Sequence, residues 1–221
     1  MKVNSLAEEN YLKALLALSG AGDEVPVNDL ARHLAIKMPT VTSMMKKLAA
    51  KRLVQYESYK PVKLTPKGKK EAAIIVRKHR LTEMFLVEKM GFGWEQVHDI
   101  AEQVEHVRSP AFFDKMDELL GYPKLDPHGS PIPDKAGKIE WKHYEKLSNC
   151  HEGDEVTLTA VLNSSADFLK FLNSRDMKLG INLKINNIEP FDRTMSVSIG
   201  KRKEILSHLV CEKLLVEKAA L

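Results

Sequence analysis

Cysteine is scarce in this sequence. Only two of the 221 residues are cysteines, Cys150 and Cys211, and neither has a second cysteine nearby. This spacing excludes both a disulfide framework and a zinc motif built on cysteine pairs. We therefore expect two reduced thiols that are packed inside the protein.

Long apolar runs are also missing. No stretch approaches the roughly 18 consecutive apolar residues that a membrane-spanning helix requires. The first residues contain no apolar signal core, and acidic residues occur early, at Glu8 and Glu9. With 43% hydrophobic and 29% charged residues, the composition is typical of a soluble globular protein, which we expect to be cytoplasmic.

Sequence motifs typical of enzymes are also missing. The chain has no serine or cysteine nucleophile motif and no glycine-rich phosphate-binding loop. We therefore expect that the protein is not an enzyme. A metalloenzyme is the rival hypothesis, because histidine and glutamate ligands on helices also form catalytic sites.

What the sequence does have is a strongly uneven charge. Residues 1–80 contain 16 lysines and arginines against 7 acids, whereas residues 81–221 contain 18 against 23. The excess lies almost entirely after Ile36, where only Glu57 and Glu71 oppose it. A basic N-terminal segment of this kind is typical of proteins that bind a polyanion such as DNA.

The same segment has the pattern of a winged helix-turn-helix. Apolar periodicity and capping residues predict helices over residues 5–19, 28–35 and 39–53, and short alternating runs at 53–57 and 62–66 predict a hairpin, or wing. In such domains the second helix of the motif enters the DNA major groove, where small side chains approach base edges and lysines contact phosphates. The predicted base-edge contacts are Pro39, Thr40, Thr42 and Ser43, and the predicted phosphate contacts are Lys37, Lys46, Lys47 and Lys60. A generic three-helix unit with a solvated basic surface is the alternative.

Residues 94–107 predict a helix with two different faces. At 100° per residue its apolar side chains gather on one side, and four potential metal ligands share an adjacent arc of roughly 100°. These four residues are His98, Glu102, Glu105 and His106. Singly, each is compatible with a solvated polar face, but together they favour a metal site.

The preceding helix, predicted to run from Pro66 to Met90, carries two more residues of ligand type. His79 and Glu83 are four positions apart, so both side chains can share one ion. With a further helix at residues 109–121, three apolar helices beside a DNA-binding domain predict a dimer interface. The other histidines have no partner at ligand spacing and are expected to be surface or hydrogen-bonded residues: His33, His128, His143, His151 and His208.

The C-terminal third changes to short alternating runs. Strand patterns occur at residues 156–162, 181–185, 194–199 and about 209–215, with one helix between them at 165–173. A few short strands around a helix in about 70 residues predict a small β-barrel. The segment before it, at about 134–151, is expected to be a linker or peripheral structure.

Six motifs in a fixed order connect these parts. They are Glu9-Asn-Tyr-Leu-Lys, Pro39-Thr-Val-Thr, Leu64-Thr-Pro-Lys-Gly, Arg77-Lys-His-Arg-Leu-Thr-Glu, Val97-His-Asp-Ile-Ala-Glu-Gln-Val-Glu-His and His128-Gly-Ser-Pro-Ile-Pro. In this order they resemble the metal-dependent repressors of the diphtheria toxin repressor and manganese transport regulator type. The resemblance covers essentially the whole chain, including a FeoA-like C-terminal barrel.

The resemblance implies a homodimer that, when loaded with a divalent cation, binds a palindromic operator and represses metal-uptake genes. By position it implies one metal site at Asn10, Glu102, Glu105 and His106, and a second at His79, Glu83 and His98. Glu102 favours Mn²⁺, because iron-sensing members typically carry cysteine there and a site without sulfur does not favour softer ions. Asn10 stands where many manganese sensors have aspartate, and Lys13 stands where one manganese-sensing branch has glutamate. Fe²⁺ therefore stays open, and other divalent transition metals are expected to substitute in vitro.

The sequence therefore predicts a mainly α-helical protein with small β parts. We expect a winged-helix DNA-binding domain at residues 1–72, a helical dimerisation and metal-binding domain at 73–140, and a FeoA-like small β-barrel domain at 152–221. The predicted function is a divalent-metal-activated repressor that favours Mn²⁺ and binds double-stranded operator DNA, with no membrane and no small-molecule substrate as partner. An Fe²⁺-dependent repressor of iron-uptake genes and a metal-independent winged-helix regulator are the alternatives.

Overall fold

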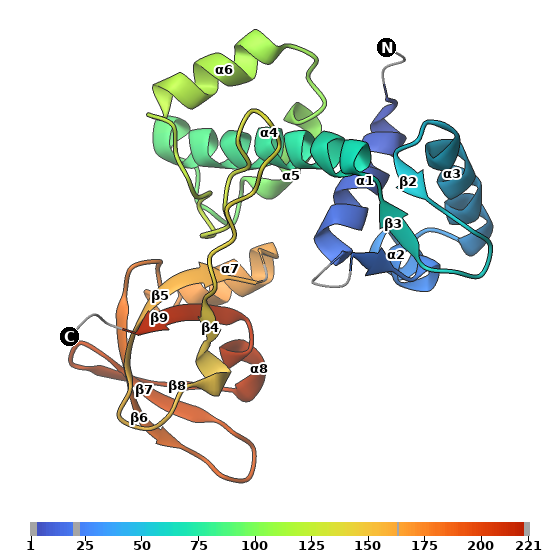
Figure 1. The fold of residues 1–221 in the computed structure, drawn as a ribbon. Helices are drawn as coiled ribbons and strands as arrows, with labels where there is room; N and C mark the ends of the chain where they lie inside the picture. The colour runs from blue at the N-terminus through green and yellow to red at the C-terminus, as the bar shows by residue number, and fades with distance from the viewer. Residues whose placement is uncertain (1–3, 20–22, 163, 219–221) are drawn as a thin grey trace. The chain divides into compact units, whose positions relative to one another are not determined.

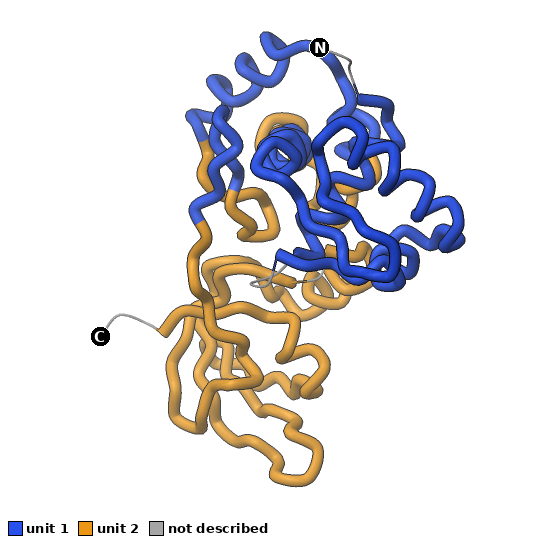
Figure 2. Tube along the Cα trace, turned by 45° about the vertical axis from the view of Figure 1, so that its right-hand side comes forward, with its two compact units in different colours: residues 1–82, 101–122, 132–140 blue, residues 83–100, 123–131, 141–221 orange. Residues whose placement is uncertain are grey.

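The computed structural model describes residues 4–19, 23–162 and 164–218 (Figure 1). The chain divides into two compact units, drawn in different colours in Figure 2. Unit 1 comprises residues 1–82, 101–122 and 132–140, and unit 2 comprises residues 83–100, 123–131 and 141–221. Among the described residues, no helix is both long enough and apolar enough to cross a membrane.

The N-terminal part of unit 1 is a winged helix (Figure 1). Its elements are α1 (Leu6–Leu18), β1 (Glu24–Val25), α2 (Val27–His33), α3 (Met38–Ala50), β2 (Val54–Gln55) and β3 (Val62–Leu64). The three short strands form an antiparallel sheet in the order β1-β3-β2, and β2 and β3 are the wing. The expected capping box starts α1, since Glu8 N–H donates to the Ser5 hydroxyl and Ser5 N–H donates to the Glu8 carboxylate.

One apolar core holds the three helices of the winged helix together. Leu12 and Leu15 of α1, Leu30 of α2, and Met45 and Leu48 of α3 are fully buried. A spacing of three residues places each pair on one face of its helix. Burial of a side chain of this size contributes about 2 kcal/mol. The core therefore fixes which face of α3 points outward.

A long helix, α4 (Pro66–Met90), begins directly after the wing. The Thr65 hydroxyl caps it by accepting a hydrogen bond from Gly68 N–H at 3.0 Å. A Cβ atom at Gly68 would lie 1.9 Å from the backbone oxygen of Leu53, so only glycine fits at this position. The first turn of α4 thus packs directly on the segment that leads into the wing.

Within unit 1, a buried ion pair joins α4 to α6 (Pro110–Leu119). The Arg77 guanidinium donates to the Asp117 carboxylate at 2.5 Å and to the carbonyl oxygen of Pro133 at 2.7 Å. Both side chains of the pair are almost completely buried. Arg77 therefore connects α4, α6 and the segment at residues 132–140.

The C-terminal part of unit 2 is a six-stranded antiparallel sheet with short helices (Figure 1). Its elements are β4 (Glu145–Lys146), the 3-10 helix η1 (Leu147–Asn149), β5 (Glu155–Val161), α7 (Ala166–Asn173), β6 (Asn182–Ile188), β7 (Met195–Ile199), β8 (Arg202–Leu206), α8 (His208–Cys211) and β9 (Leu214–Lys218). The strand order is β4-β9-β5-β6-β7-β8. Alternate residues such as Val156 and Leu158 are buried, and Leu169 and Leu172 of α7 pack in the same core.

Both cysteines lie in this C-terminal core as free thiols, which confirms the sequence-based expectation. Burial raises the pKa of Cys150 to about 11 and that of Cys211 to about 12. The thiolate form is therefore strongly disfavoured at neutral pH, and both residues act as small apolar side chains.

The helix expected over residues 94–107 was predicted too long. The observed helix, α5 (His98–Val104), starts later, because Trp94 is held by tertiary contacts. Its indole N–H donates to the Asn173 side chain at 2.7 Å, and its carbonyl oxygen accepts from His128 Nε2 at 2.9 Å. A helix starting at Trp94 would engage this carbonyl in the helix itself, so apolar periodicity alone was misleading here.

Smaller differences from the expected elements have local causes. The third helix ends at Ala50 rather than at residue 53, and β1 was not expected because two residues are too short for an alternating pattern. The expected closing strand at residues 209–215 begins instead as α8, which the hydroxyl of Ser207 caps by accepting from Val210 N–H.

Candidate metal centre and DNA-binding surface

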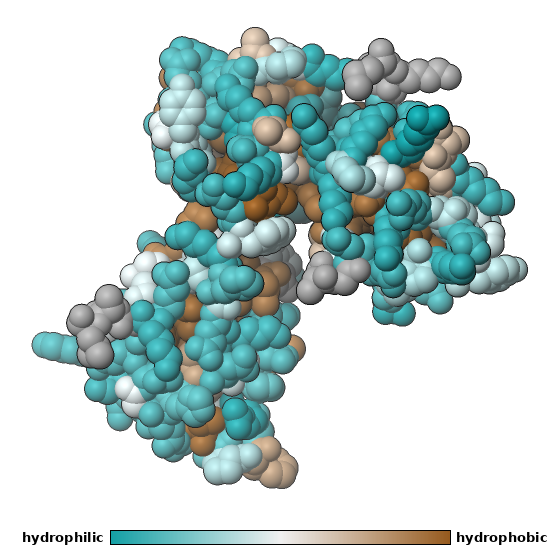
Figure 3. Space-filling view, in the orientation of Figure 1, coloured by the Kyte–Doolittle hydropathy of each residue, from teal (hydrophilic) through white to brown (hydrophobic). Residues whose placement is uncertain are grey.

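The start of α3 presents the predicted DNA contacts. Lys37 is the N-cap residue, and the first turn contains no acid. Val41 and Met45 face the core, so the other side of the helix is open to solvent. Of the predicted contacts on and before this helix, Thr42 is half-buried and the rest are exposed: Lys37, Pro39, Thr40, Ser43, Lys46 and Lys47. On the face seen in Figure 3, hydrophilic residues cover much of the surface of both units.

A hollow of about 570 Å³ lies between α3 and the wing. Thr42 and Lys46 line it from α3, and Tyr59 and Lys60 line it from the wing. The Lys60 ammonium pairs with Glu57 at 2.8 Å, and both side chains remain largely exposed. Tyr59 is fully exposed and adopts a left-handed φ of 67°, and sequence reasoning did not single it out. An aromatic residue inside a polar hairpin turn was the available signal.

A buried carboxylate connects α1 to α3. Glu8 is 1% exposed, and its Oε1 lies 2.7 Å from Lys51 Nζ and 3.4 Å from Lys47 Nζ. Burial alone would raise the pKa of Glu8, but hydrogen bonds from Lys51 and from Ser5 N–H, with the charges of both lysines, lower it to about 2. Lys47 therefore faces this carboxylate while its side chain stays half-exposed.

Side chains of α1 contact three members of the first predicted ligand set within unit 1, namely Glu102, Glu105 and His106. Glu105 continues the helical hydrogen bonding of α5, since its N–H donates to the Ala101 carbonyl at 2.9 Å. The Lys13 ammonium of α1 contacts both carboxylates of this set. It lies 2.8 Å from Glu105 Oε1 and also pairs with Glu102 Oε1. Glu105 is completely buried, whereas Glu102 is partly exposed.

His106 is oriented by a residue that sequence reasoning missed. Its Nδ1 lies 2.6 Å from Glu9 Oε2, and its Nε2 lies 3.8 Å from Glu105 Oε1. An ionised carboxylate only accepts hydrogen bonds, so Nδ1 donates to Glu9, and Nε2 lies on the Glu105 side. A carboxylate behind the ring is the usual arrangement for a histidine that binds a metal. The signal was present in the sequence, since Glu9 directly precedes Asn10.

Asn10 shows a feature that fits metal binding. Its side-chain oxygen is buried and has no hydrogen-bond partner. Buried amide oxygens almost always have a hydrogen-bond partner. The Asn10 oxygen has none, and a bound cation would take that place. An amide oxygen, two carboxylates and an imidazole form a donor set without sulfur, which suits Mn²⁺ or Fe²⁺. The residues present therefore fit a divalent ion.

His79 joins the first set rather than standing apart from it. Its Nδ1 lies 2.6 Å from Glu105 Oε2 and 3.9 Å from Glu102 Oε1. His79, Glu102 and Glu105 each offer a ligand atom within 4.8 Å of the others. The sequence placed His79 only in the second set, because helical spacing relates it to Glu83 and gives no information on Glu105.

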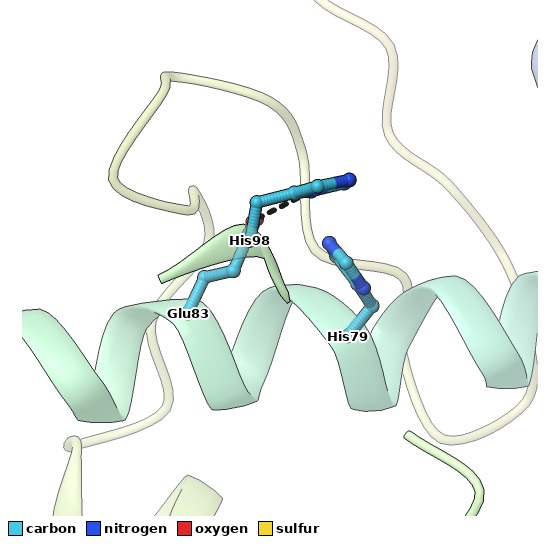
Figure 4. Close-up of side chains that lie close together, drawn as sticks. All are labelled: His79, Glu83 and His98. Carbon is cyan, nitrogen blue, oxygen red and sulfur yellow. Dashed lines mark hydrogen bonds and ion pairs between the residues drawn. The ribbon is translucent and has the colours of Figure 1, made fainter. Parts of the chain in front are cut away.

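The second predicted set is centred on Glu83 (Figure 4). Glu83 lies one turn after His79 on α4, and its Oε1 is 3.4 Å from His98 Nδ1. The Glu83 side chain is buried, and that of His98 is half-exposed. Within unit 2, the Glu83 carboxylate therefore pairs with His98, which is predicted to bind the same ion.

His128 is buried and hydrogen-bonded, which is the second of the two environments expected for it. Its Nε2 donates to the Trp94 carbonyl, its ring stacks on Trp94 at 5.9 Å, and its Nδ1 lies 3.6 Å from Glu83 Oε2. Burial lowers the pKa of His128, but the hydrogen bond and charge of Glu83, with the charge of Asp126, raise it overall. His128, Glu83 and Asp126 form a third group whose ligand atoms lie within 4.8 Å, which helical spacing did not reveal.

Three family models match successive parts of the chain. They are the iron dependent repressor N-terminal DNA binding domain at residues 5–62, the iron dependent repressor metal binding and dimerisation domain at 65–134, and the FeoA domain at 145–218. The diphtheria toxin repressor of Corynebacterium efficiens is 33% identical over 194 aligned positions, and the match covers 81% of this chain and 82% of that protein. The chain belongs to the iron dependent repressor family.

Two further members of the family show its range. The iron-dependent repressor IdeR of Mycobacterium leprae is 33% identical over 125 residues, covering 57% of this chain and 54% of IdeR, so the match spans about half the length of that relative. A solved manganese-dependent transcriptional repressor in complex with manganese has a TM-score of 0.87 at 30% identity, covering 96% of this chain and 100% of that one. The expected fold class and family are thereby confirmed.

Proposed function

We propose that this chain is a transcriptional repressor that binds double-stranded operator DNA when a divalent metal is bound, with Mn²⁺ favoured. The observation that carries the proposal is the position of α1, a helix of the winged helix. Glu9 of α1 orients His106, and Lys13 of α1 pairs with Glu105. Side chains of the DNA-binding part therefore belong to the candidate metal centre.

The first ion would be held by Asn10, Glu102, Glu105 and His106. When bound, it supplies two positive charges to the carboxylates of Glu102 and Glu105. Glu9 holds the His106 ring with Nε2 available. His79 lies close enough to Glu105 to take part. A second ion at His79, Glu83 and His98 stays a prediction.

The residues of α1 suggest how metal binding reaches the DNA surface. Glu8 pairs with Lys47 of α3 and with Lys51, the C-cap residue of that helix, and the next two residues belong to the candidate metal centre. A shift of α1 at the metal centre would therefore move α3 with it. Bound metal would favour one position of α1 by its higher affinity for that position.

The choice of Mn²⁺ over Fe²⁺ rests on the donor atoms. The set contains oxygen and nitrogen donors, with Glu102 rather than a sulfur ligand. Mn²⁺ competes poorly with other transition metal ions for soft donors such as sulfur. A site built on oxygen removes the advantage that those ions gain from sulfur ligands. The Asn10 ligand is neutral and lowers the affinity for any ion. Repression would then target genes for metal uptake.

The assembly that we propose is a cytoplasmic homodimer without enzymatic activity. Phe112 and Leu119 of α6 are large apolar side chains that are 44% and 51% exposed. A second copy of the chain would cover them. Two winged helices related by a two-fold axis would then bind a palindromic operator.

A titration of DNA binding against metal tests the proposal. Metal-free protein would be added to a fluorescent duplex selected from a random pool, and anisotropy would be measured with Mn²⁺, with Fe²⁺ under anaerobic conditions, and with Mg²⁺. We expect Mn²⁺ to tighten binding about tenfold or more and at least as well as Fe²⁺. Glu105→Gln and His106→Ala should abolish the effect and leave the protein folded.

His151→Ala is the matched control, because this histidine side chain is 85% exposed and remote in sequence from the metal centre. It should respond to Mn²⁺ like the wild-type protein. If metal-free protein bound the duplex as tightly as metal-loaded protein, the chain would be a metal-independent regulator and the proposal would be wrong.

A further inference from the structure

Lys13 places a cation among the atoms of the candidate metal centre. Its Nζ lies 2.8 Å from Glu105 Oε1 and 2.9 Å from Oε2, and it also donates to Glu102 Oε1. Two of these oxygens, Glu102 Oε1 and Glu105 Oε2, accept hydrogen bonds from the ammonium, whereas Glu105 Oε1 makes an ion-pair contact without a hydrogen bond. The Lys13 side chain is 19% exposed and that of Glu105 is 0% exposed, so this contact is largely removed from water.

Two histidines lie near the same Glu105 oxygens as the Lys13 ammonium, so this ammonium lies within the candidate metal centre rather than at its edge. His79 Nδ1 lies 2.6 Å from Glu105 Oε2, and His106 Nε2 lies 3.8 Å from Oε1. Lys13 contacts both of these oxygens. An ion that used Glu105 as a ligand would therefore have to take an oxygen that Lys13 already holds.

We infer that Lys13 is an internal cation that occupies Glu102 and Glu105 in the metal-free protein and is displaced when a divalent ion binds. The inference rests on the proposed function. A divalent ion binds its oxygen ligands at about 2.0–2.6 Å, so an ammonium on the same oxygens would lie only a few ångströms from it. Repulsion between two cations at this distance is strong where water is largely excluded.

Two consequences follow for this chain. First, the metal-free centre is not a bare pair of buried carboxylates, because Lys13 neutralises part of their charge. Second, each ion has to compete with a cation that is attached to the protein and always present. Lys13 therefore raises the metal concentration at which the protein responds, and it disfavours ions that bind carboxylates weakly.

Calorimetric titration with MnCl₂ in the absence of DNA tests the inference. Lys13→Met keeps the length of the side chain and removes its charge, and we expect it to bind Mn²⁺ with a Kd about tenfold lower than the wild-type protein. Lys13→Arg keeps a cation and should stay close to wild type. Lys115→Met removes an exposed lysine of α6 and is the control for loss of charge.

A second measurement follows Lys13 in the wild-type protein itself. Lysines would be methylated reductively, and the rate at each site would be measured by mass spectrometry with and without Mn²⁺. We expect Lys13 to react slowly in metal-free protein and faster when Mn²⁺ is bound, while Lys115 reacts at the same rate in both. Circular dichroism would show that each variant is folded.

The outcomes separate the inference from the proposed function. Equal or weaker Mn²⁺ binding by folded Lys13→Met, or unchanged protection of Lys13 in Mn²⁺-saturated protein, would overturn the inference alone. Absence of Mn²⁺ binding in both wild-type and variant proteins would overturn the proposed function and the inference together. Tighter binding by Lys13→Met with release of Lys13 in the wild type supports both.

Discussion

The Glu8 carboxylate shows how much a single residue of α1 contributes to the winged helix. It is buried against Lys51 and Lys47, and its pKa is lowered to about 2. The two lysines that pair with it are 22% and 55% exposed, so removal of the carboxylate leaves neither charge fully buried, and the loss is that of charge-assisted hydrogen bonds. We expect Glu8→Gln to lower the free energy of unfolding by about 1–3 kcal/mol, measured by denaturant titration at pH 7.

The contribution of Glu8 to stability should decrease as the pH is lowered. The pKa of Glu8 is about 2 in the folded protein against an ordinary value of 4.5, so the folded state binds fewer protons between these values. Its contribution to stability is therefore present above about pH 4.5 and is lost as the pH falls towards 2. Glu57→Gln is the control, because the Glu57–Lys60 pair is exposed and should change stability little. Equal losses in both variants would contradict this account.

We expect the variants Lys47→Ala and Thr40→Ala to change DNA binding in different ways. The half-exposed Lys47 is a predicted phosphate contact, so Lys47→Ala should weaken binding to all duplexes and reduce the salt slope by about 1. The exposed Thr40 is a predicted base-edge contact, so Thr40→Ala should change the preferred sequence instead. Anisotropy at several salt concentrations, with two unrelated duplexes, measures both effects. An unchanged salt slope for Lys47→Ala would remove it from the phosphate contacts.

At the level of helices and strands, the start of α4 depends on one glycine. A Cβ atom at Gly68 would lie 1.9 Å from the Leu53 oxygen, which is backbone and cannot rotate away. We expect Gly68→Ala to cost about 1–3 kcal/mol, seen as a lower melting temperature in calorimetry. Lys67→Ala, at the half-exposed neighbouring position, should stay within about 0.5 kcal/mol of wild type. A wild-type melting temperature for Gly68→Ala would show that the helix can start elsewhere.

Sequence patterns predicted elements well where local chemistry decides their ends. The Ser5 and Glu8 pair marked the start of α1, and Pro66 marked the start of α4. They failed where distant contacts decide, as at Trp94, whose carbonyl accepts a bond from His128. The contact of His79 with Glu105 likewise joins residues 26 positions apart, which no helical spacing reveals.

The predicted metal ligands also show that sequence patterns do not reveal contacts between distant residues. Helical spacing brought Glu102, Glu105 and His106 together, and the family resemblance added Asn10. Neither source gave Glu9 as the partner of His106 or Lys13 as a cation on Glu105. Both come from α1, and their role depends on how α1 packs in unit 1. Side chains that support a metal centre therefore stayed hidden although its ligands were predicted.

At the level of the whole molecule, we expect the exposed apolar side chains of α6 to control self-association. Phe112→Ser with Leu119→Ser removes two large apolar groups that are 44% and 51% exposed. Sedimentation velocity should show a shift from dimer towards monomer in this double variant. Lys115→Ala changes an exposed residue of the same helix and should leave the dimer intact. A wild-type sedimentation profile for the double variant would place the dimer contact elsewhere.

The start of α3 has a further consequence for recognition. The N-cap residue Lys37 makes no side-chain cap, and the first turn carries no acid. No acidic side chain of this turn therefore offsets the partial positive charge of about half a unit at the N-terminus of the helix. A phosphate bound at this end would be attracted by the backbone as well as by the exposed lysines, so replacement of any one lysine by alanine would leave part of the attraction in place.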